Sequence, residues 1–452
     1  LYGQEVNDET WAICKADMLI KGEDEPNIRP GSTLSEDAFA TTRFDFMLAN
    51  PPFGKSWKTD LDRIGGKGEV TDARFTVRFA DGTAGSVVTR TSDGQLMFLA
   101  NMLAKMKDDT ALGSRVATVH NGSSLFSGDA GAGESNLRRH VIEGDLLEAI
   151  IALPLRLFYN TGIATYVWVL ANRKAARRRG KVQLIDATAW SRPLRKNLGQ
   201  KSVELAPEDI QRVVTTFLDF KETEHSKIFD NAHFGHWEVT VERPLRLRVE
   251  GSPERLRRLS SACADANDGA LYALVNAAFQ RLGVRATRDY NTFAEALDAE
   301  AAARKEKVSD KRRRLVRAAI TTRDPEAEPV VSRVAEGKKA VAAPLRGRFA
   351  VKRKGANAVV EYEPDPELRE TEQVPLMEEG GVEALLTREV LPYAADAWED
   401  ASARRVGYKV NFNKHFYTPQ AMRSPEEIRA EIVQVHAESE GLLAAILGRS
   451  VT

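Results

Sequence analysis

The chain has 452 residues and a mass of 50.0 kDa, which allows two or three domains. Its 42% hydrophobic content supports substantial buried cores, and 65 basic residues balance 65 acidic ones, so any basic surface must be local. The two cysteines, Cys14 and Cys263, exclude a disulfide framework and lack metal-type spacing, which predicts a protein of the reducing cytoplasm. We see no signal-peptide pattern and no apolar run long enough to span a bilayer.

Strand-like and helix-like patterns alternate up to about residue 190. Residues 55–91 are rich in Gly, Asp, Lys and Thr and give no firm element, and so long a connection is often a functional loop. The alternation predicts an α/β fold with a largely parallel sheet covered by helices on both faces, whose ligands bind at the carboxyl ends of the strands. The predicted helices span residues 8–19, 95–107 and 136–143, and the predicted strands span residues 44–49, 115–120, 146–153, 163–170 and 181–186.

The later part of the chain is more charged and more helical. Its predicted elements are a helix over 206–221, a strand pair over 236–249, charged helices over 253–320, a linker over 321–345 and short strands over 349–362. Ser424-Pro425-Glu426-Glu427 has the pattern of a capping box and predicts the start of a long final helix. The near-heptad apolar stripe of that helix either packs on its own domain or pairs with a partner subunit.

The most informative motif is Asn50-Pro51-Pro52-Phe53, which follows an apolar run typical of a buried strand. Such a tetrapeptide occurs by chance in about one chain of this size in several hundred. The Asn50 amide oxygen and the Pro51 carbonyl oxygen are hydrogen-bond acceptors on a backbone that the prolines make rigid. Two acceptors aimed at an exocyclic amine localise its lone pair and stabilise the charge that develops on it, while Phe53 offers a face for a flat ring. The alternative is an ordinary strand that ends in a proline turn.

Residues 1 to about 250 and the end of the chain resemble the modification (M) subunits of bacterial Type I restriction-modification systems. The segments that carry the resemblance are residues 2–5, 49–54, 152–165, 192–199, 222–229, 243–247 and 407–417 with the final helix. These subunits are adenine DNA methyltransferases that use S-adenosylmethionine, so the resemblance implies a Rossmann-like methyltransferase sheet followed by a mixed, mainly helical carboxyl-terminal region. It also implies that the chain acts in the cytoplasm of a bacterium or archaeon, with double-stranded DNA and the specificity (S) and restriction (R) subunits as partners.

The same resemblance suggests a division of the chain into four parts. Residues 1–190 would be a partial catalytic domain, and residues 191–250 an extension packed on it. Residues 251–345 would be a charged helical region with its linker. Residues 346–452 would form a carboxyl-terminal region that contacts other subunits.

The resemblance gives single residues roles in holding the target base. Asn50 and Pro51 would orient and polarise the adenine amino group. Phe53 and Phe158 would stack on the two faces of a base flipped out of the duplex. The alternative for Phe158 is an ordinary core residue.

Two acidic residues are implied in cofactor binding. Glu5 would accept hydrogen bonds from the cofactor's ribose hydroxyls, as carboxylates do in dinucleotide folds, and Asp17 would lie near its adenine. The alternatives are solvated surface residues. The family's glycine-rich cofactor loop is expected before Glu5 and has no match here, and the chain starts in mid-strand without Met. We therefore expect a fragment with a gap in its sheet that binds S-adenosylmethionine weakly or not at all by itself.

Two basic clusters, at residues 173–181 and 311–314, either neutralise DNA phosphates or form solvated helix faces. The sequence shows no set of zinc ligands and no other metal site, no supported Ser/His/Asp arrangement, no P-loop and no nuclease motif.

Two other functions stay open. One is a non-catalytic scaffold that docks S or R subunits through the carboxyl-terminal half. The other keeps the transferase chemistry but acts on a protein glutamine amide, as related Asn-Pro-Pro-aromatic sites do. The long carboxyl-terminal extension favours DNA, because in this family recognition is delegated to a partner.

Overall fold

The computed structural model describes residues 1–65, 70–159, 161–336, 341–353, 356–417 and 424–448. They form two compact units, Leu1–Val410 and Asn411–Thr452. Among these residues, no helix combines the length and the apolar character that a membrane crossing requires.

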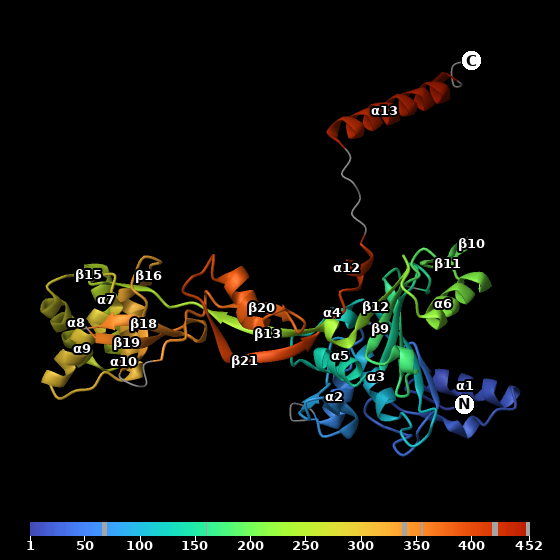
Figure 1. Cartoon of the computed structure of the whole chain (residues 1–452), viewed down its shortest axis with the longest axis horizontal. Coiled ribbons are helices and arrows are strands. Elements are labelled where there is room, and N and C mark those ends of the chain that lie inside the picture. Colours follow the sequence, from blue (N-terminus) through green and yellow to red (C-terminus); the bar gives the residue numbers. More distant parts are fainter. Residues whose placement is uncertain (66–69, 160, 337–340, 354–355, 418–423, 449–452) are drawn as a thin grey trace. The chain divides into compact units, whose positions relative to one another are not determined.

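The centre of the first unit is a six-stranded sheet with the order β12-β9-β7-β8-β6-β3 (Figure 1). Its strands are β3 (Phe46–Ala49), β6 (Arg115–Asn121), β7 (Leu147–Ala152), β8 (Thr165–Ala171), β9 (Lys181–Asp186) and β12 (Ser226–Asp230). β3, β6, β7 and β9 run in one direction, whereas β8 and β12 run in the other. The prediction of a largely parallel sheet is wrong at β8, because the described part of the connection 153–164 holds no crossover helix and β8 returns beside β7.

The core of this sheet lies in β7, β8 and β9. All six residues of β7 are buried, since the strand is apolar on both faces apart from Glu148. Trp168 of β8 is completely buried. The helices of this part of the chain are α1 (Asp8–Ile20), α2 (Lys58–Ile64), α3 (Gln95–Ala104), α4 (Ser123–Phe126), α5 (Gly133–Glu143) and α6 (Pro207–Asp219).

The first strands of the chain stand apart from the main sheet. β1 (Gly3–Glu5) and β2 (Ile28–Pro30) pair in parallel as a separate two-stranded sheet, which agrees with the expected gap. β3 is consequently an edge strand that pairs with β6 alone among the described residues. Phe46 and Leu48 are 73% and 84% exposed, so the prediction that this strand is buried is wrong.

The segment 55–91 is more ordered than its composition predicts. Besides α2 it contains the hairpin of β4 (Thr76–Arg78) and β5 (Ala84–Ser86). The side chains of Trp57, Phe75 and Val87 are buried. These few large apolar residues, spaced too widely to show a period, fix the segment against its surroundings.

Among the described residues beyond β9, the first unit contains four smaller sheets. β10 (Arg192–Leu198) and β11 (Lys201–Glu204) form a hairpin, and β13 (Gly235–Glu242) lies between β20 (Glu370–Pro375) and β21 (Trp398–Tyr408). β14 (Leu247–Glu250) lies between β15 (Ala286–Thr287) and β16 (Thr321–Arg323), and β19 (Ala356–Tyr362) between β17 (Val331–Ala335) and β18 (Arg348–Arg353). The linker predicted over 321–345 is therefore wrong, because β16 and β17 pair with β14 and β19. The two strands predicted over 236–249 exist, but they belong to different sheets.

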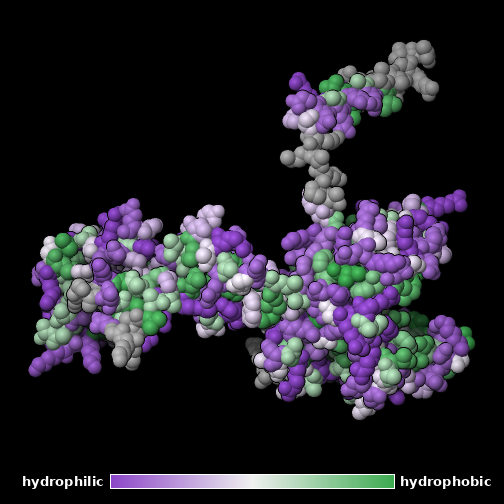
Figure 2. Space-filling view, viewed as in Figure 1, coloured by the Kyte–Doolittle hydropathy of each residue, from purple (hydrophilic) through white to green (hydrophobic). Residues whose placement is uncertain are grey.

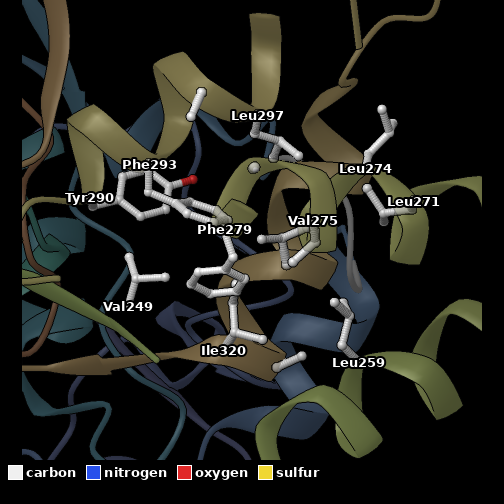
Figure 3. Close-up of a cluster of buried hydrophobic side chains, with 14 of the residues drawn as sticks. Val249, Leu259, Leu271, Leu274, Val275, Phe279, Tyr290, Phe293, Leu297 and Ile320 are labelled. Carbon is white, nitrogen blue, oxygen red and sulfur yellow. The ribbon is translucent and has the colours of Figure 1, made fainter. Parts of the chain in front are cut away.

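The helices of the charged region pack around a second hydrophobic core (Figure 3). These helices are α7 (Pro253–Asp265), α8 (Gly269–Leu282), α9 (Tyr290–Ala303) and α10 (Asp310–Ile320). Phe279 and Phe293 meet at its centre with ring centroids 5.1 Å apart. Each helix buries one apolar stripe there, which explains how so charged a sequence still folds. A short helix, α11 (Gly381–Leu385), precedes β21.

The second unit contains α12 (Phe412–Phe416) and α13 (Pro425–Gly448). The predicted capping box at the start of α13 is confirmed. The Ser424 N–H donates to Glu427 Oε2 at 2.8 Å, and the Glu427 N–H donates to Ser424 Oγ at 3.1 Å. Whether α13 pairs with a partner subunit stays a prediction.

Candidate active site

The Asn50 turn, residues 50–53, follows β3 at its carboxyl end. Asn50 is exposed, Pro51 is buried and Phe53 is half-buried. Among the described residues, none exchanges a hydrogen bond with the Asn50 amide, and no N–H donates to the Pro51 carbonyl. Both acceptors that the sequence singled out thus lack a hydrogen-bond partner among the described residues, and the Asn50 side chain is exposed.

The backbone just after the turn is held firmly. Gly54 has φ +62°, a conformation that favours glycine, and its N–H donates to Asp93 Oδ1 at 3.2 Å. The Trp57 N–H donates to the Thr91 carbonyl at 3.0 Å, and the Gly94 N–H donates to the Lys55 carbonyl at 3.2 Å. Two antiparallel stretches, 54–57 and 91–94, are therefore joined side by side.

Asp93 is itself held by the first residue of α3 and by the residues after β6. Its Oδ2 accepts from Gln95 Nε2 at 2.6 Å and from Ser123 Oγ at 3.3 Å. Gln95 Nε2 also donates to Asn121 Oδ1 at 2.8 Å, and Gln95 Oε1 accepts from the Asn121 N–H at 3.0 Å. This network joins the Asn50 turn to the carboxyl end of β6, so the turn is positioned by a neighbouring strand as well as by its prolines.

His120, a buried residue of β6, also contacts Gln95 of this network. Its Nδ1 lies 3.2 Å from Gln95 Oε1, which is an acceptor, so Nδ1 carries the proton. Nε2 is buried without a protein partner. Burial lowers the pKa of His120 from 6.5 to about 3, so the ring is neutral at physiological pH. A neutral ring serves as a structural support here and not as an acid.

Four strands end at one edge of the sheet, which we name the carboxyl edge. Because β3, β6, β7 and β9 run in the same direction, the Asn50 turn, the residues after β6 and the loop after β7 all lie at this edge. Adjacent strands are about 4.8 Å apart, so the loop after β7 begins about 15 Å from the Asn50 turn. Ligands of such sheets bind at this edge.

Phe158 lies in the loop after β7, at the carboxyl edge. It is half-buried and packs on a cluster formed by Ile151, Leu153, Leu157, Ile185, Ala187 and Trp190. Part of the Phe158 side chain thus packs in the core, which agrees with the alternative given for it above. Its stacking role stays a prediction.

The two predicted cofactor residues differ in how they are engaged. Glu5 ends β1, and its Oε1 accepts from the Asn7 N–H at 2.7 Å. Asp17 forms an exposed ion pair with Lys21 at 2.6 Å, one turn further along α1. No hydrogen bond or ion pair among the described residues joins either carboxylate to the Asn50 turn. Their cofactor roles stay predictions. The carboxylate of Asp17 is already paired with Lys21.

The two basic clusters of the sequence are largely engaged within the protein. In the first, which lies between β8 and β9 and so at the edge opposite to Asn50, Lys174 binds Asp145 at 2.6 Å and buried Arg178 donates to the Phe217 carbonyl. In the second, Arg312 binds Asp268 at 2.6 Å and Arg313 binds Asp298 at 2.7 Å. Within the described residues no group of three or more His, Cys, Asp or Glu side chains could hold a metal ion.

Sequence reasoning missed the residues that position the Asn50 turn, namely Asp93, Gln95 and Ser123. The available signal was weak: a polar residue with Gly94 before an apolar helix, about forty positions after the motif. Nothing in the sequence shows that the side chains of Gln95 and Ser123 meet that of Asp93, which in turn accepts from the Gly54 N–H.

The chain is similar to several known proteins. The model of the N-6 DNA Methylase family matches residues 1–239. The Type I restriction enzyme MjaIX methylase subunit of Methanocaldococcus jannaschii is 27% identical over 224 residues, which cover 50% of this chain and 36% of that protein. The HindI methylase subunit of Haemophilus influenzae is 28% identical over 189 residues, 41% of this chain and 37% of that protein.

Among solved structures, the methyltransferase subunit of a type I restriction-modification system from Streptococcus thermophilus is similar over 51% of this chain and 44% of its own, with 22% identity and a TM-score of 0.41. The chain spans little more than a third of the length of the curated relatives it matches. The family model covers more than half of the chain, and its match includes the Asn50 turn and the whole six-stranded sheet. The chain belongs to the N-6 DNA methylase family.

Proposed function

We propose that this chain carries the catalytic part of the modification subunit of a Type I restriction-modification system, which transfers a methyl group to the N6 amino group of adenine in DNA. The observation that carries the proposal is the Asn50 turn. It presents two partner-free acceptors at the carboxyl edge of the sheet on a backbone that Asp93 holds in place.

The turn suits an aromatic amine. Adenine N6 is a poor nucleophile because its lone pair is delocalised into the ring. When its two hydrogens are donated to Asn50 Oδ1 and the Pro51 carbonyl oxygen, the lone pair localises toward the methyl donor and the positive charge that develops is stabilised. A strong base is unnecessary, because the proton can leave after the methyl group has been transferred.

The residues around the Asn50 turn make its backbone rigid. Pro51 and Pro52 restrict the backbone, and the Gly54–Asp93 hydrogen bond fixes the chain just after the turn. The acceptors thus need little rearrangement when the base arrives, which is the condition for electrostatic stabilisation to lower a barrier. Phe53, half-buried, would hold one face of the base, and Phe158 the other.

S-adenosylmethionine is the methyl donor that we propose. It supplies an activated methyl group on sulfur. Glu5 fits a role in holding it, because one carboxylate oxygen is fixed by the Asn7 N–H at the end of β1 while the other can accept from ribose hydroxyls. Asp17, paired with Lys21, fits less well.

Double-stranded DNA and the specificity and restriction subunits are the partners that we propose. The relatives are named methylase subunits of Type I restriction enzymes. The resemblance stated above implies that such a subunit leaves sequence recognition to another chain. The exposed position of Asn50 at a sheet edge is compatible with a base that is flipped out of a duplex.

The test is transfer of a labelled methyl group from S-adenosylmethionine by a complex reconstituted with the specificity subunit. DNA and protein acceptors are offered together, and the product nucleosides are separated by mass. We expect the label in N6-methyladenine. Label in protein glutamine would replace DNA as the substrate, and no label in either acceptor, with correct assembly, would favour a scaffold.

A further inference from the structure

The hairpin of β10 and β11 is a basic element with an exposed strand, β10, at the carboxyl edge. It follows β9, whose carboxyl end lies at that edge, and its two strands pair only with each other among the described residues. Gly199, with φ +61°, forms the tight turn. On the face shown in Figure 2, hydrophilic side chains dominate the surface over β10 and β11.

An irregular pairing sets the direction of the basic side chains. Pro193 pairs with Val203 and Leu198 with Lys201, so residues 194–197 of β10 lie opposite a single residue of β11, Ser202. Bulges of this kind redirect side chains and loosen the ladder. Arg195 and Lys196 lie within the bulge and are exposed.

The hairpin is also fastened to the catalytic edge. The Ser202 N–H, which the bulge frees, donates to the Arg156 carbonyl at 3.1 Å. Arg156 belongs to the loop after β7 that also carries Phe158. Val203 packs on the hydrophobic cluster beneath that loop, so the base of the hairpin is anchored while its bulge faces solvent.

The cations of this surface lack acidic partners. Arg192 pairs with Glu204 at 2.9 Å, but the side chains of Arg156, Arg195 and Lys196 have no hydrogen bond or ion pair to any residue that the structure describes. Lys201 Nζ lies 5.4 Å from the ring centroid of exposed Tyr159. The chain as a whole is neutral, so this local excess of positive charge is a distinct feature.

We propose that this surface, formed by Arg156, Arg195, Lys196 and Lys201, binds the sugar–phosphate backbone of the DNA whose adenine enters the Asn50 turn. The proposal rests on the proposed function. β7 and β9 lie three and four strands from β3, which places the surface about 15–20 Å from the turn. A duplex carries one phosphate charge per about 1.7 Å of its axis, so its backbone still faces the hairpin over that span.

The test is the salt dependence of DNA binding. The 452-residue chain is titrated against a fluorescent 30-bp duplex at several KCl concentrations, without methyl donor. For the double variant Arg195→Gln/Lys196→Gln we expect the slope of log K against log salt to fall by about 2, and affinity at 0.1 M salt to fall about tenfold to a hundredfold. Binding by Arg195→Lys/Lys196→Arg should stay close to that of the unaltered chain, because the charges remain.

A matched control lies at the opposite edge of the sheet. Arg173 and Arg179 are exposed residues of the first basic cluster, and Arg173→Gln/Arg179→Gln should leave slope and affinity unchanged. Equal effects of the two neutralised pairs, or none from the hairpin pair, would overturn the proposal. Because binding is measured without transfer, that failure leaves the assignment of Asn50 standing. Conversely, a hairpin that binds DNA in a chain whose complex methylates protein would refute the proposed function alone.

Discussion

The Asn50 turn and the helices around α10 use polar groups in opposite ways. In α10, two arginine side chains form hydrogen-bonded ion pairs within the protein. Arg312 binds Asp268 and Glu306, and Arg317 forms two bonds with Glu363. At the turn, the supporting groups are satisfied while the Asn50 amide is left open. A dense run of charge in the sequence therefore marks structure here, whereas a single partner-free amide on a rigid backbone marks the candidate site.

The strongest test of this contrast is Asn50→Ala. Loss of one of two acceptors should lower transfer to adenine by about a thousandfold or more in the reconstituted complex. The free energy of unfolding should change by less than about 0.5 kcal/mol, because the amide is exposed and has no protein partner. Asn357→Ala, at an exposed position of β19, is the control for removing a surface amide. Turnover close to that of the unaltered complex would remove Asn50 from the mechanism.

Asp93→Ala tests whether support for the turn can be separated from the turn itself. The Gly54 and Gln95 N–H groups and the Gln95 amide would lose their acceptor. We expect kcat to fall about tenfold to a hundredfold and unfolding to become easier by about 1–3 kcal/mol. KM for DNA should stay nearly unchanged, since Asp93 does not line the basic hairpin. A parallel rise in KM would instead indicate that the whole carboxyl edge has unfolded. Ser123→Ala, which leaves the Gly54–Asp93 hydrogen bond in place and removes only one of the bonds to Asp93, should have a smaller effect on both quantities.

Arg312→Ala addresses the other side of the comparison. Arg312 donates to both Asp268 oxygens, and this hydrogen bonding lowers the pKa of Asp268 from its usual 3.8. We expect a loss of about 1–2 kcal/mol in urea unfolding at pH 7, with unchanged transfer per folded molecule. Because a depressed carboxyl pKa stabilises above the unfolded value, the difference from the unaltered chain should shrink as pH falls below about 4. A pH-independent difference would show that packing, not the ion pair, is lost.

The last expected effect, a pH dependence that needs no substitution, concerns His120. Its pKa falls from 6.5 to about 3 on burial, so the unfolded chain takes up a proton below pH 6.5 that the folded chain does not. Stability should therefore decline by about 1.4 kcal/mol per pH unit from this residue between roughly pH 6 and pH 4. The pKa of His236 is lowered to about 4, chiefly by burial, and this adds in the same direction. An NMR titration in which the His120 ring signal stays flat from pH 8 to pH 5 checks the assignment.

Much of the sheet and the candidate Asn50 motif follow from local sequence. Strands such as 115–121 and 181–186 carry several β-branched or other apolar residues between polar ends, and the capping box before α13 is a contact within four residues. The order of strands is not local: β8 was expected in a largely parallel sheet, and only its pairing with both β6 and β7 shows otherwise.

The contacts that hold the Asn50 turn could not be predicted from the sequence for the same reason: they join residues far apart in the chain. Asp93 meets Gly54 across thirty-nine residues of sequence, and Ser202 meets Arg156 although the strands β8, β9 and β10 lie between them in the sequence. Such contacts leave no period or spacing. The segment 55–91 was likewise misjudged, because a few buried aromatic side chains, Trp57 and Phe75 among them, order it without a repeating pattern.

The open side of β3 has a practical consequence for anyone who purifies this chain. Backbone groups of an edge strand that carries two bare apolar side chains, Phe46 and Leu48, are a template for another copy to add to. Concentrated stocks should self-associate through that strand, and a lysine in place of Leu48 should keep them monodisperse.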